Sequence, residues 1–278
     1  MKSFSTVSSL REALEPHRSQ TIGFVPTMGA LHEGHISLVE RARKECDTVV
    51  VSVFVNPTQF NDKNDLKNYP RTPEADCAIL EAAGADIVFM PTVEDIYPEP
   101  DTRVFDFGLV DKVMEGATRP GHFNGVAQVV SRLFDMVKPA RAYFGEKDFQ
   151  QIAVIKAMVA QLNIDIEIVE CAIVRGEDGL ALSSRNELLT PEHRKAAPHI
   201  YATISQCAAK MTTMTPAELT QWVVETIDSN PLLKTIYFEA VDALTMQKVE
   251  NWSDSKRIQG CCAVQAGNIR LIDNIKIK

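Results

Sequence analysis

Apolar runs of strand length alternate with amphipathic stretches along the first two thirds of the chain. Residues 22–25 form one apolar run, and residues 49–55 are apolar at every position except Ser52. Between them, apolar side chains recur at positions 36, 39, 42 and 46, the spacing of three and four that is typical of an amphipathic helix. The alternation predicts strands over 21–25, 48–55, 86–90 and 142–144, and helices over 35–45, 73–83, 124–137 and 149–161.

This order of strands and helices predicts an α/β fold, a Rossmann-like doubly wound parallel sheet with helices on both faces. The run 49–55 is apolar enough for a central strand that is buried on both sides and has parallel neighbours. Pro26 has no N–H group to donate, so we expect it to end the ladder of the first strand. Residues 1–16 predict a short amphipathic helix, and residues 60–72, where Asn, Asp and Lys replace the apolar pattern, predict a mobile loop.

The pattern changes at about residue 176, after which polar loops precede helices near 191–210 and 216–228. The last fifty residues have the pattern of strands, and 266–269 is expected to join 260–265 to 269–273 as a hairpin. We therefore expect a first, nucleotide-binding domain over residues 1–175 and a smaller α/β C-terminal domain over 176–278. The second domain is expected to close over the first as a lid.

Composition narrows the class of protein. The 278 residues carry a net charge of −8 and the pI is near 5.3, which disfavours a general nucleic-acid surface. Six cysteines without a Cys-x-x-Cys pair indicate neither a zinc site nor a disulfide framework, so a reducing cytoplasm is expected. The N-terminal residues do not resemble a signal peptide, and no apolar run has membrane-spanning length, so no membrane partner is expected.

The segment 26–35, Pro-Thr-Met-Gly-Ala-Leu-His-Glu-Gly-His, lies between the first strand and the first long helix. Its two histidines, His32 and His35, are expected on one face at the start of that helix. Unpaired backbone N–H groups and the positive end of the helix dipole attract phosphate oxygens there. Two imidazoles beside them can donate hydrogen bonds to charge that develops on an attacked phosphorus. The segment therefore predicts a site for a nucleotide triphosphate.

Two other interpretations of the histidine pair remain open. Histidines three residues apart can bind a metal ion, or can be ordinary polar residues near the surface. The zinc-protease pattern is excluded because it needs histidines four apart, and here the spacing is one residue short. Gly29 and Gly34, the strand before and the helix after favour phosphate binding.

Polar segments also follow two later strands, at 56–60 (Asn-Pro-Thr-Gln-Phe) and 145–151 (Gly-Glu-Lys-Asp-Phe-Gln-Gln). Loops at the carboxyl ends of parallel strands meet at one edge of a sheet, so these segments are expected to converge with 26–35 on one cleft. Gln59 and Gln151 are candidates to bind a hydroxyl or a carboxylate of a small substrate, or are ordinary surface amides.

A second candidate constellation is Ser183-Ser184-Arg185, which lies in a polar loop. Two hydroxyls and a planar guanidinium suit a triphosphate tail, although the same tripeptide can simply cap a helix and add a surface charge. Lys147 and Asp148 have a similar alternative, as a solvated pair in which Asp148 caps the helix that follows.

The paired elements, His-x-Gly-His and a downstream Ser-Ser-Arg loop, resemble the HIGH and KMSKS elements of the nucleotidylyltransferase superfamily. The strings PTMGALHEGH, FVNPTQF, YPRT, RPGHFNGV, FGEKDFQQ and SSRN, with the terminal RLIDN, resemble the pantothenate synthetase family, also called pantoate–β-alanine ligases. The resemblance implies a ligase that forms a C–N bond. Pantoate attacks the α-phosphorus of ATP to give pantoyl adenylate and pyrophosphate, and β-alanine then displaces AMP to give pantothenate.

The resemblance also implies roles for individual residues. His35 would donate a proton or stabilise charge with His32 beside it, and Gln59 and Gln151 would bind pantoate. Lys147 would contact the phosphates and Asp148 the ribose, while Val174 and Leu182 would flank the adenine. Residues implied to bind ATP are Met28, Gly29, Ala30, Leu31, His32, Glu33, Gly34, His35, Gly145, Glu146, Lys147, Asp148, Val174, Leu182, Ser183, Ser184 and Arg185, of which His32, His35, Lys147, Ser183, Ser184 and Arg185 would be catalytic.

Leu182 stands where many relatives have methionine, and the similar volume and polarity should preserve adenine packing. Mg²⁺ is expected on the β- and γ-phosphates of ATP, mostly through water molecules, so no protein ligand is assigned. A homodimer is expected from the resemblance alone.

Four other functions are compatible with parts of the pattern, and one of them is a zinc-binding structural module. Another adenylyl- or cytidylyltransferase of the superfamily would use a phosphorylated acceptor and stop at the nucleotide product. A class I aminoacyl-tRNA synthetase shares the two motifs but needs a surface for tRNA, which this short acidic chain does not favour. A nucleotide sensor without turnover would have no need of the histidine pair together with Lys147 and Ser-Ser-Arg.

Overall fold

The computed structural model, which describes residues 1–61 and 63–278, divides into two units. Unit 1 comprises residues 1–107, 119–146 and 154–172. Unit 2 comprises residues 108–118, 147–153 and 173–278. Two internal segments, residues 108–118 and 147–153, therefore belong with the C-terminal residues.

The sheet of unit 1 has six strands, and all of its strand pairs are parallel. Their order is β1-β4-β3-β2-β5-β6, with β3 between two parallel neighbours as its apolar sequence predicts. The strands are β1 (Lys2–Phe4), β2 (Ile22–Thr27), β3 (Thr48–Val53), β4 (Ile87–Phe89), β5 (Arg141–Gly145) and β6 (Glu167–Cys171).

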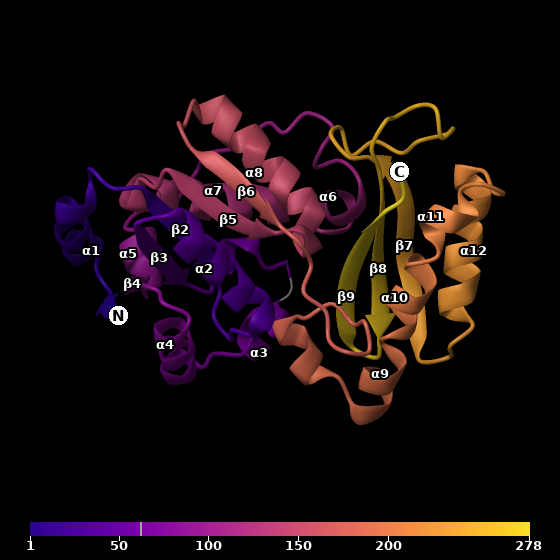
Figure 1. Ribbon diagram of the computed structural model, residues 1–278, viewed down its shortest axis with the longest axis horizontal. Helices are drawn as coiled ribbons and strands as arrows, with labels where there is room; N and C mark the ends of the chain where they lie inside the picture. The colour runs from indigo at the N-terminus through magenta and orange to yellow at the C-terminus, as the bar shows by residue number, and fades with distance from the viewer. Residues whose placement is uncertain (62) are drawn as a thin grey trace. The chain divides into compact units, whose positions relative to one another are not determined.

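Helices cover both faces of this sheet (Figure 1). On one face, Leu38 and Val39 of α2 join a buried cluster with Val25 and Val51 of the sheet. Phe24 points to the opposite face, where its ring meets that of Phe134 of α7 at a centroid distance of 6.3 Å. The doubly wound parallel sheet is confirmed. The helices that contribute to this unit are α1 (Val7–Leu14), α2 (Glu33–Glu45), α3 (Lys63–Asn68), α4 (Pro73–Ala82), α5 (Val93–Ile96), α7 (His122–Val137) and α8 (Phe149–Leu162), whose first turn lies in unit 2.

The strand order reverses between β2 and β5. From β2 the chain proceeds outward through β3 to β4, and it then returns to the other side of β2 with β5 and continues outward to β6. In open parallel sheets, ligands bind at the carboxyl ends of the strands at such a reversal. The loop that begins after Thr27 and the loop that begins after Gly145 both start at this position.

Three sequence predictions in unit 1 need correction. Strand β2 continues through Pro26, which is opposite Ser52 of β3. Residues of a parallel strand direct their backbone groups alternately to the two sides, and the carbonyl of Thr27 accepts from Phe54 on the β3 side. Pro26 therefore faces the β5 side, where pairing already ends at Phe24, and its missing N–H costs no ladder bond.

The other two corrections concern the predicted helix over 1–16 and the predicted loop over 60–72. Residues 2–4 form β1, which adds to the edge of the sheet beside β4, before α1 begins at Val7. The segment 60–72 contains the short helix α3, so it is not a loop throughout, and its residue 62 lies outside the described residues.

Unit 2 contains an antiparallel sheet in the order β7-β8-β9 (Figure 1). The predicted hairpin is confirmed, because Ala266 pairs with Ile269 across a two-residue turn in which Gly267 has a φ of +60°. The strands are β7 (Leu233–Asp242), β8 (Ile258–Ala266) and β9 (Ile269–Lys276), and the helices are α6 (Met114–Thr118), α9 (Pro191–Ala196), α10 (His199–Ile204), α11 (Cys207–Lys210) and α12 (Pro216–Asp228).

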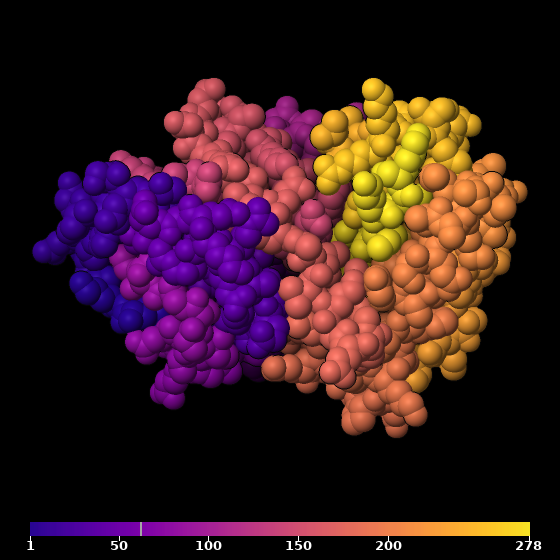
Figure 2. Space-filling model, in the orientation of Figure 1, coloured from indigo at the N-terminus to yellow at the C-terminus, as the bar shows by residue number. Residues whose placement is uncertain are grey.

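Both faces of the small sheet are covered. On one face, Ile200 of α10 and Val223 of α12 share a buried cluster with Cys262 and Leu271. On the other face, Cys261 packs with Phe149 and with other apolar residues of the segments 108–118 and 147–153. In the space-filling view the C-terminal residues, in yellow, lie against residues drawn in orange (Figure 2). The predicted smaller α/β C-terminal domain is confirmed, although it also includes these two earlier segments.

Among the described residues, no helix combines the length and the apolar character that crossing a bilayer requires.

We predict that Phe134→Ala lowers the free energy of unfolding by about 3–5 kcal/mol, because Phe134 is 2% exposed and its ring contacts those of Phe24 and Phe144. Urea denaturation followed by circular dichroism measures this change. Val104→Ala serves as the control, since Val104 is 85% exposed and its truncation should change stability by less than about 0.5 kcal/mol. Equal effects of the two substitutions would contradict the packing described here.

Candidate active site

The loop after β2 turns sharply before α2 begins. Gly29 and Ala30 both have left-handed backbone conformations, with φ of +83° and +49°. A Cβ atom on Gly29 would lie 3.0 Å from a carboxylate oxygen of Asp76 and 3.0 Å from a methyl group of Val53. Glycine is therefore required at this position both for its conformation and for the close approach of its neighbours.

Asp76, in the first turn of α4, organises this loop. Its side chain is buried, and its two oxygens accept hydrogen bonds from the backbone N–H groups of Ala30 (3.0 Å) and Leu31 (2.8 Å). The hydroxyl of Thr72 donates a further bond of 3.1 Å to the same carboxylate. Asp76 was not predicted from the sequence, because an acidic residue in a first helical turn is also typical of an exposed helix N-terminus.

The two histidines form a reciprocal cap at the start of α2. The Nδ1 atom of His32 accepts from the N–H of Gly34 (3.1 Å), and the Nδ1 atom of His35 accepts from the N–H of His32 (3.3 Å). Their ring centroids are 4.1 Å apart. The helix begins at Glu33 with His32 as the extended N-cap residue, two positions earlier than predicted.

This cap determines where each imidazole carries its proton. A nitrogen that accepts a backbone N–H has no hydrogen of its own, so a neutral ring must carry its hydrogen on Nε2. Both histidines therefore present Nε2–H as a donor. The prediction of unpaired N–H groups at the start of this helix is wrong for His32 and Gly34, whose N–H groups donate to the side chains of His35 and His32.

The loop after β3 brings Gln59 to the loop after β2. The Nε2 atom of Gln59 lies 3.1 Å from the sulfur of Met28, and its Oε1 atom accepts from the amide of Asn56 (3.2 Å). His122 Nδ1 donates to the Gln59 carbonyl over 2.8 Å. Residues from the segments 26–35, 56–60 and 119–125 are thus in contact within unit 1. Gly145 and Glu146 of the same unit lie at the end of β5, the strand beside β2.

Asn56 and Gly125 determine the position of the Gln59 loop. Asn56 is 1% exposed, and its amide donates to the carbonyl of Gly125 (3.1 Å) while its oxygen accepts from the hydroxyl of Tyr97 (2.9 Å). A Cβ atom on Gly125 would lie 2.6 Å from the carbonyl oxygen of Thr58, so only glycine allows α7 to approach this closely. The loop therefore rests directly on the N-terminal part of α7.

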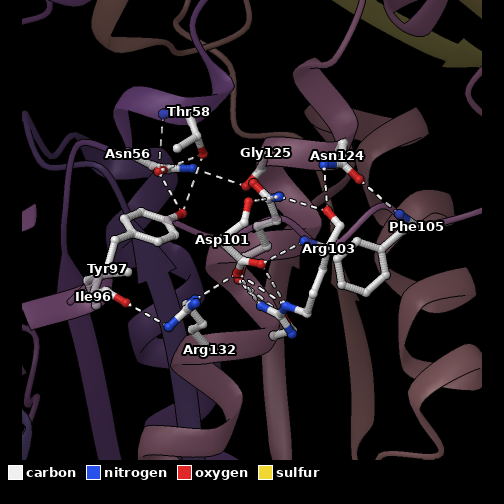
Figure 3. A network of polar contacts seen from close by, with 12 residues as sticks. Asn56, Thr58, Ile96, Tyr97, Asp101, Arg103, Phe105, Asn124, Gly125 and Arg132 are labelled. Atoms are coloured by element: carbon white, nitrogen blue, oxygen red, sulfur yellow. Dashed lines mark hydrogen bonds and ion pairs between the residues drawn. The ribbon is translucent and has the colours of Figure 1, made fainter. Parts of the chain in front are cut away.

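A polar network on α7 continues from this loop (Figure 3). Asn124, Gln128 and Arg132 recur at intervals of four and so share one face of the helix. Asn124 and Gln128 donate to the carbonyl of Arg103, and Arg132 donates to the carboxylate of Asp101 (2.7 Å).

Asp101 is the charged centre of this network. Its side chain is 2% exposed and accepts from Arg103 (2.6 Å) as well as from Arg132. The Arg103 guanidinium, with that of Arg132, holds the pKa of Asp101 well below its usual range, although burial acts in the opposite direction. Burial raises the pKa of the neighbouring Tyr97.

The remaining predicted site residues belong to unit 2. Lys147 is 20% exposed at its side chain, and its Nζ atom lies 3.9 Å from the carboxylate of Asp148. Gln150 is buried and donates to the carbonyls of Val110 (2.7 Å) and Val113 (2.9 Å), whereas Gln151 is half-buried. Of the two adjacent glutamines, Gln150 thus has a structural role, while the substrate-binding role of Gln151 stays a prediction.

Residues 174–182 of unit 2 form a small hairpin. The N–H of Leu182 donates to the carbonyl of Val174 (3.0 Å), which brings together the two residues implied to flank adenine. The Ser183 hydroxyl accepts from the N–H of Arg185 (3.3 Å) at the start of the short 3-10 helix Ser184–Leu188. The capping interpretation of Ser183 is therefore confirmed, while the phosphate-binding role stays a prediction.

A parallel sheet with helices on both faces, and a helix that begins at the reversal of strand order, defines the class of Rossmann-like α/β proteins. Within this class the chain belongs to the pantoate–β-alanine ligase family, whose model matches residues 2–276. Family membership makes the chain an enzyme, a ligase.

Members of this family from other organisms are similar to this chain over nearly its full length. The pantothenate synthetase of Porphyromonas gingivalis is 58% identical, and that of Bacteroides fragilis strain YCH46 is 55% identical, with at least 99% of each chain covered. The crystal structure of pantothenate synthetase from Thermus thermophilus matches with a TM-score of 0.94 and 46% identity over 100% of this chain and 99% of that one. The ligase from Francisella tularensis, complexed with β-γ ATP and β-alanine, matches with a TM-score of 0.84 and 37% identity over 100% and 98%.

We predict that Asp76→Asn lowers the free energy of unfolding by about 1–3 kcal/mol, because an amide NH₂ group would face one of the two loop N–H groups that the carboxylate now accepts. Urea denaturation measures the loss, and faster hydrogen exchange at Ala30 and Leu31 locates it. Asp135→Asn is the matched control, a surface carboxylate paired with Arg11 whose loss should cost less than about 1 kcal/mol. Unchanged exchange at the loop would reject the organising role of Asp76.

The ionised carboxylate of Asp101 should stabilise the folded protein, and this contribution should depend on pH. Because that pKa is lowered by folding, its contribution is complete above about pH 4, the unfolded value, and decreases as the pH falls further. We expect Asp101→Asn to cost about 2–3 kcal/mol at pH 7, since two arginines lose a charged acceptor but Arg103 is 43% exposed. Urea denaturation at pH 7 and pH 3 should show the difference from wild type shrinking at pH 3. A difference that is the same at both pH values would be incompatible with this assignment.

Proposed function

We propose that this chain uses ATP to condense pantoate with β-alanine, forming pantothenate through pantoyl adenylate. In the first step a carboxylate oxygen of pantoate bonds to the α-phosphorus of ATP and the bond to pyrophosphate breaks. In the second step the amine of β-alanine bonds to the acyl carbon and AMP leaves. The observation that carries the proposal is the reciprocal histidine cap at the strand reversal, in a chain that belongs to this ligase family.

The two imidazoles suit the first step. A carboxylate and ATP repel each other, so a catalyst must neutralise phosphate charge and hold the reactants in line. With Nδ1 of each ring accepting a backbone N–H, Nε2–H is the donor that each neutral ring would offer to the charge that develops on the α-phosphoryl oxygens. We assign His35 to this charge and His32 beside it.

The remaining residues receive roles by family motif. In this proposal ATP binds Met28–His35 and 145–148, with Lys147 on the phosphates and Asp148 on the ribose. Val174 and Leu182 flank the adenine, and Ser183–Arg185 bind the phosphate tail. Gln59 and Gln151 bind pantoate. The proximity of Gln59 and Met28 supports the assignment of pantoate beside the ATP loop.

Several wider features also remain proposals. Mg²⁺ enters with ATP on its β- and γ-phosphates, and no group of three His, Cys, Asp or Glu side chains among the described residues is arranged to hold a metal ion. We further propose a cytoplasmic homodimer, a nucleotide- and pantoate-binding domain over residues 1–175, and a lid over residues 176–278.

Trapping the intermediate tests the function. The enzyme is incubated with ATP, Mg²⁺ and pantoate but without β-alanine, and mass spectrometry should detect enzyme-bound pantoyl adenylate. Adding β-alanine should release AMP and pantothenate. AMP release without pantoate, or a stable nucleotide product with a phosphorylated acceptor, would instead favour another nucleotidylyltransferase.

We predict that His35→Ala and Lys147→Ala each slow pantoate-dependent pyrophosphate exchange by at least about two powers of ten, because each removes a donor aimed at developing phosphate charge. ATP affinity, measured by calorimetry, should weaken less. Exchange rates near that of the wild type would reject these roles.

His35→Asn separates the two functions of His35. The amide oxygen of Asn can replace Nδ1 as the acceptor for the His32 N–H, but it supplies no equivalent of Nε2–H. The Asn variant should therefore retain stability better than the Ala variant and be equally slow in exchange.

A further inference from the structure

The terminal motif Arg270-Leu271-Ile272-Asp273-Asn274 lies in β9, and no role has been assigned to it. Its polar side chains are not simply part of the sheet surface. Asp273 is 4% exposed and Asn274 is 3% exposed, so each must have partners inside unit 2. Successive residues of a strand point to opposite faces of the sheet, so the pair reaches two different parts of the unit.

On one face, Asn274 reaches the backbone of Lys147. Its Nδ2 atom donates to the Lys147 carbonyl over 3.1 Å, and its Oδ1 atom accepts from the buried amide of Gln259 over 2.7 Å. The amide of Asn274 thus uses its oxygen for Gln259 and its NH₂ group for the backbone of Lys147, the residue proposed to contact the phosphates.

The same face holds the segment after Lys147 at a second point. Arg270, four residues before Asn274, pairs with the carboxylate of Glu115, which also accepts from the Tyr237 hydroxyl (2.9 Å). The N–H of Glu115 in turn donates to the side chain of Gln150 (3.0 Å). The segment 147–151 is thus fixed to β9 directly through Asn274 and indirectly through Arg270 and Glu115.

On the opposite face, Asp273 holds the hairpin 174–182. Its two oxygens accept from the two terminal nitrogens of Arg175 over 2.6 and 2.8 Å, a bidentate pair. The same guanidinium donates to the Gly179 carbonyl (3.2 Å) and lies 3.8 Å from the centroid of the Tyr201 ring. Arg175 follows Val174 directly, so its orientation determines the position of the residue proposed to contact adenine.

We infer that Asp273 and Asn274 are positioning residues that hold the adenine-binding hairpin and Lys147 at a set spacing from opposite faces of one strand. The inference rests on the proposed function and adds residues that touch no substrate. A set spacing matters because the adenine and the phosphates of one ATP must be bound together, and a displacement of about 1 Å can cost as much as about a hundredfold in rate.

The test compares Asn274→Ala with Gln259→Ala in the full-length enzyme. Both substitutions break the buried Gln259–Asn274 hydrogen bond, but only the first removes the donor to Lys147. We expect Asn274→Ala to lower kcat for pantoate-dependent pyrophosphate exchange at least about tenfold. Gln259→Ala should remain within about twofold of the wild type, and thermal unfolding of both variants corrects for lost stability. In a Lys147→Ala background, Asn274→Ala should cause no further decrease.

Asp273→Asn tests the other face. It keeps the side-chain volume but weakens the bidentate pair with Arg175, so the Kd for ATP measured by calorimetry should increase by roughly three- to tenfold with little change in kcat. General destabilisation would affect both variants in the same way. It would not lower kcat in Asn274→Ala while weakening ATP affinity in Asp273→Asn.

The opposing outcomes are distinct. If the wild type shows no pantoate-dependent exchange, the proposed function fails. If the wild type is active but Asn274→Ala behaves like Gln259→Ala, or Asp273→Asn leaves the Kd for ATP unchanged, the positioning inference fails alone. Should Asn274→Ala not fold, Asn274→Leu preserves the volume. If neither folds while Gln259→Ala does, Asn274 is a core residue and the positioning role is rejected.

Discussion

The parallel pairing of β2 with both β3 and β5 is the constraint on which unit 1 depends. Parallel strands all end at the same edge, so every loop that follows a strand there begins beside its neighbours. The reversal of strand order between β2 and β5 then leaves the loop after β2 in a central position. The contacts of Gln59 with Met28 and with His122 follow from this topology, although the three residues are far apart in the sequence.

The topology brings these loops together, and buried polar side chains then determine the conformation of each loop. Asp76 accepts the N–H groups of two consecutive loop residues, and Asn56 joins three separate segments through a single amide. Each of these groups would be costly to bury without partners, so the loop conformation that satisfies them is strongly favoured over the alternatives. Asn274 uses the same physical device in unit 2, where its donor meets the Lys147 carbonyl. The loops therefore derive their shape from residues that need not touch a ligand.

Sequence patterns predicted the helices and strands that form because of interactions between residues close together in the sequence. The period of three to four predicted α2, and the Gly-Asn turn predicted the β8–β9 hairpin. Edge strand β1 was missed because three residues, Lys2–Phe4, carry no periodic signal and pair only through the distant β4. The effect of Pro26 was misjudged because it depends on where pairing with β5 stops. Asp76 was missed for the same kind of reason, since its partners lie about 45 residues away in sequence.

The reciprocal histidine cap connects folding and chemistry at one pair of side chains. A cap residue must accept a backbone N–H, and for histidine this requires a bare Nδ1 atom. A nitrogen that carries a hydrogen cannot accept the N–H of Gly34 or His32, so the cap requires rings with no hydrogen on Nδ1. A neutral imidazole in this cap therefore carries its hydrogen on Nε2. A serine or an asparagine would cap the helix equally well, but neither has the second ring nitrogen of histidine, which is what the proposed donation to a phosphate would use.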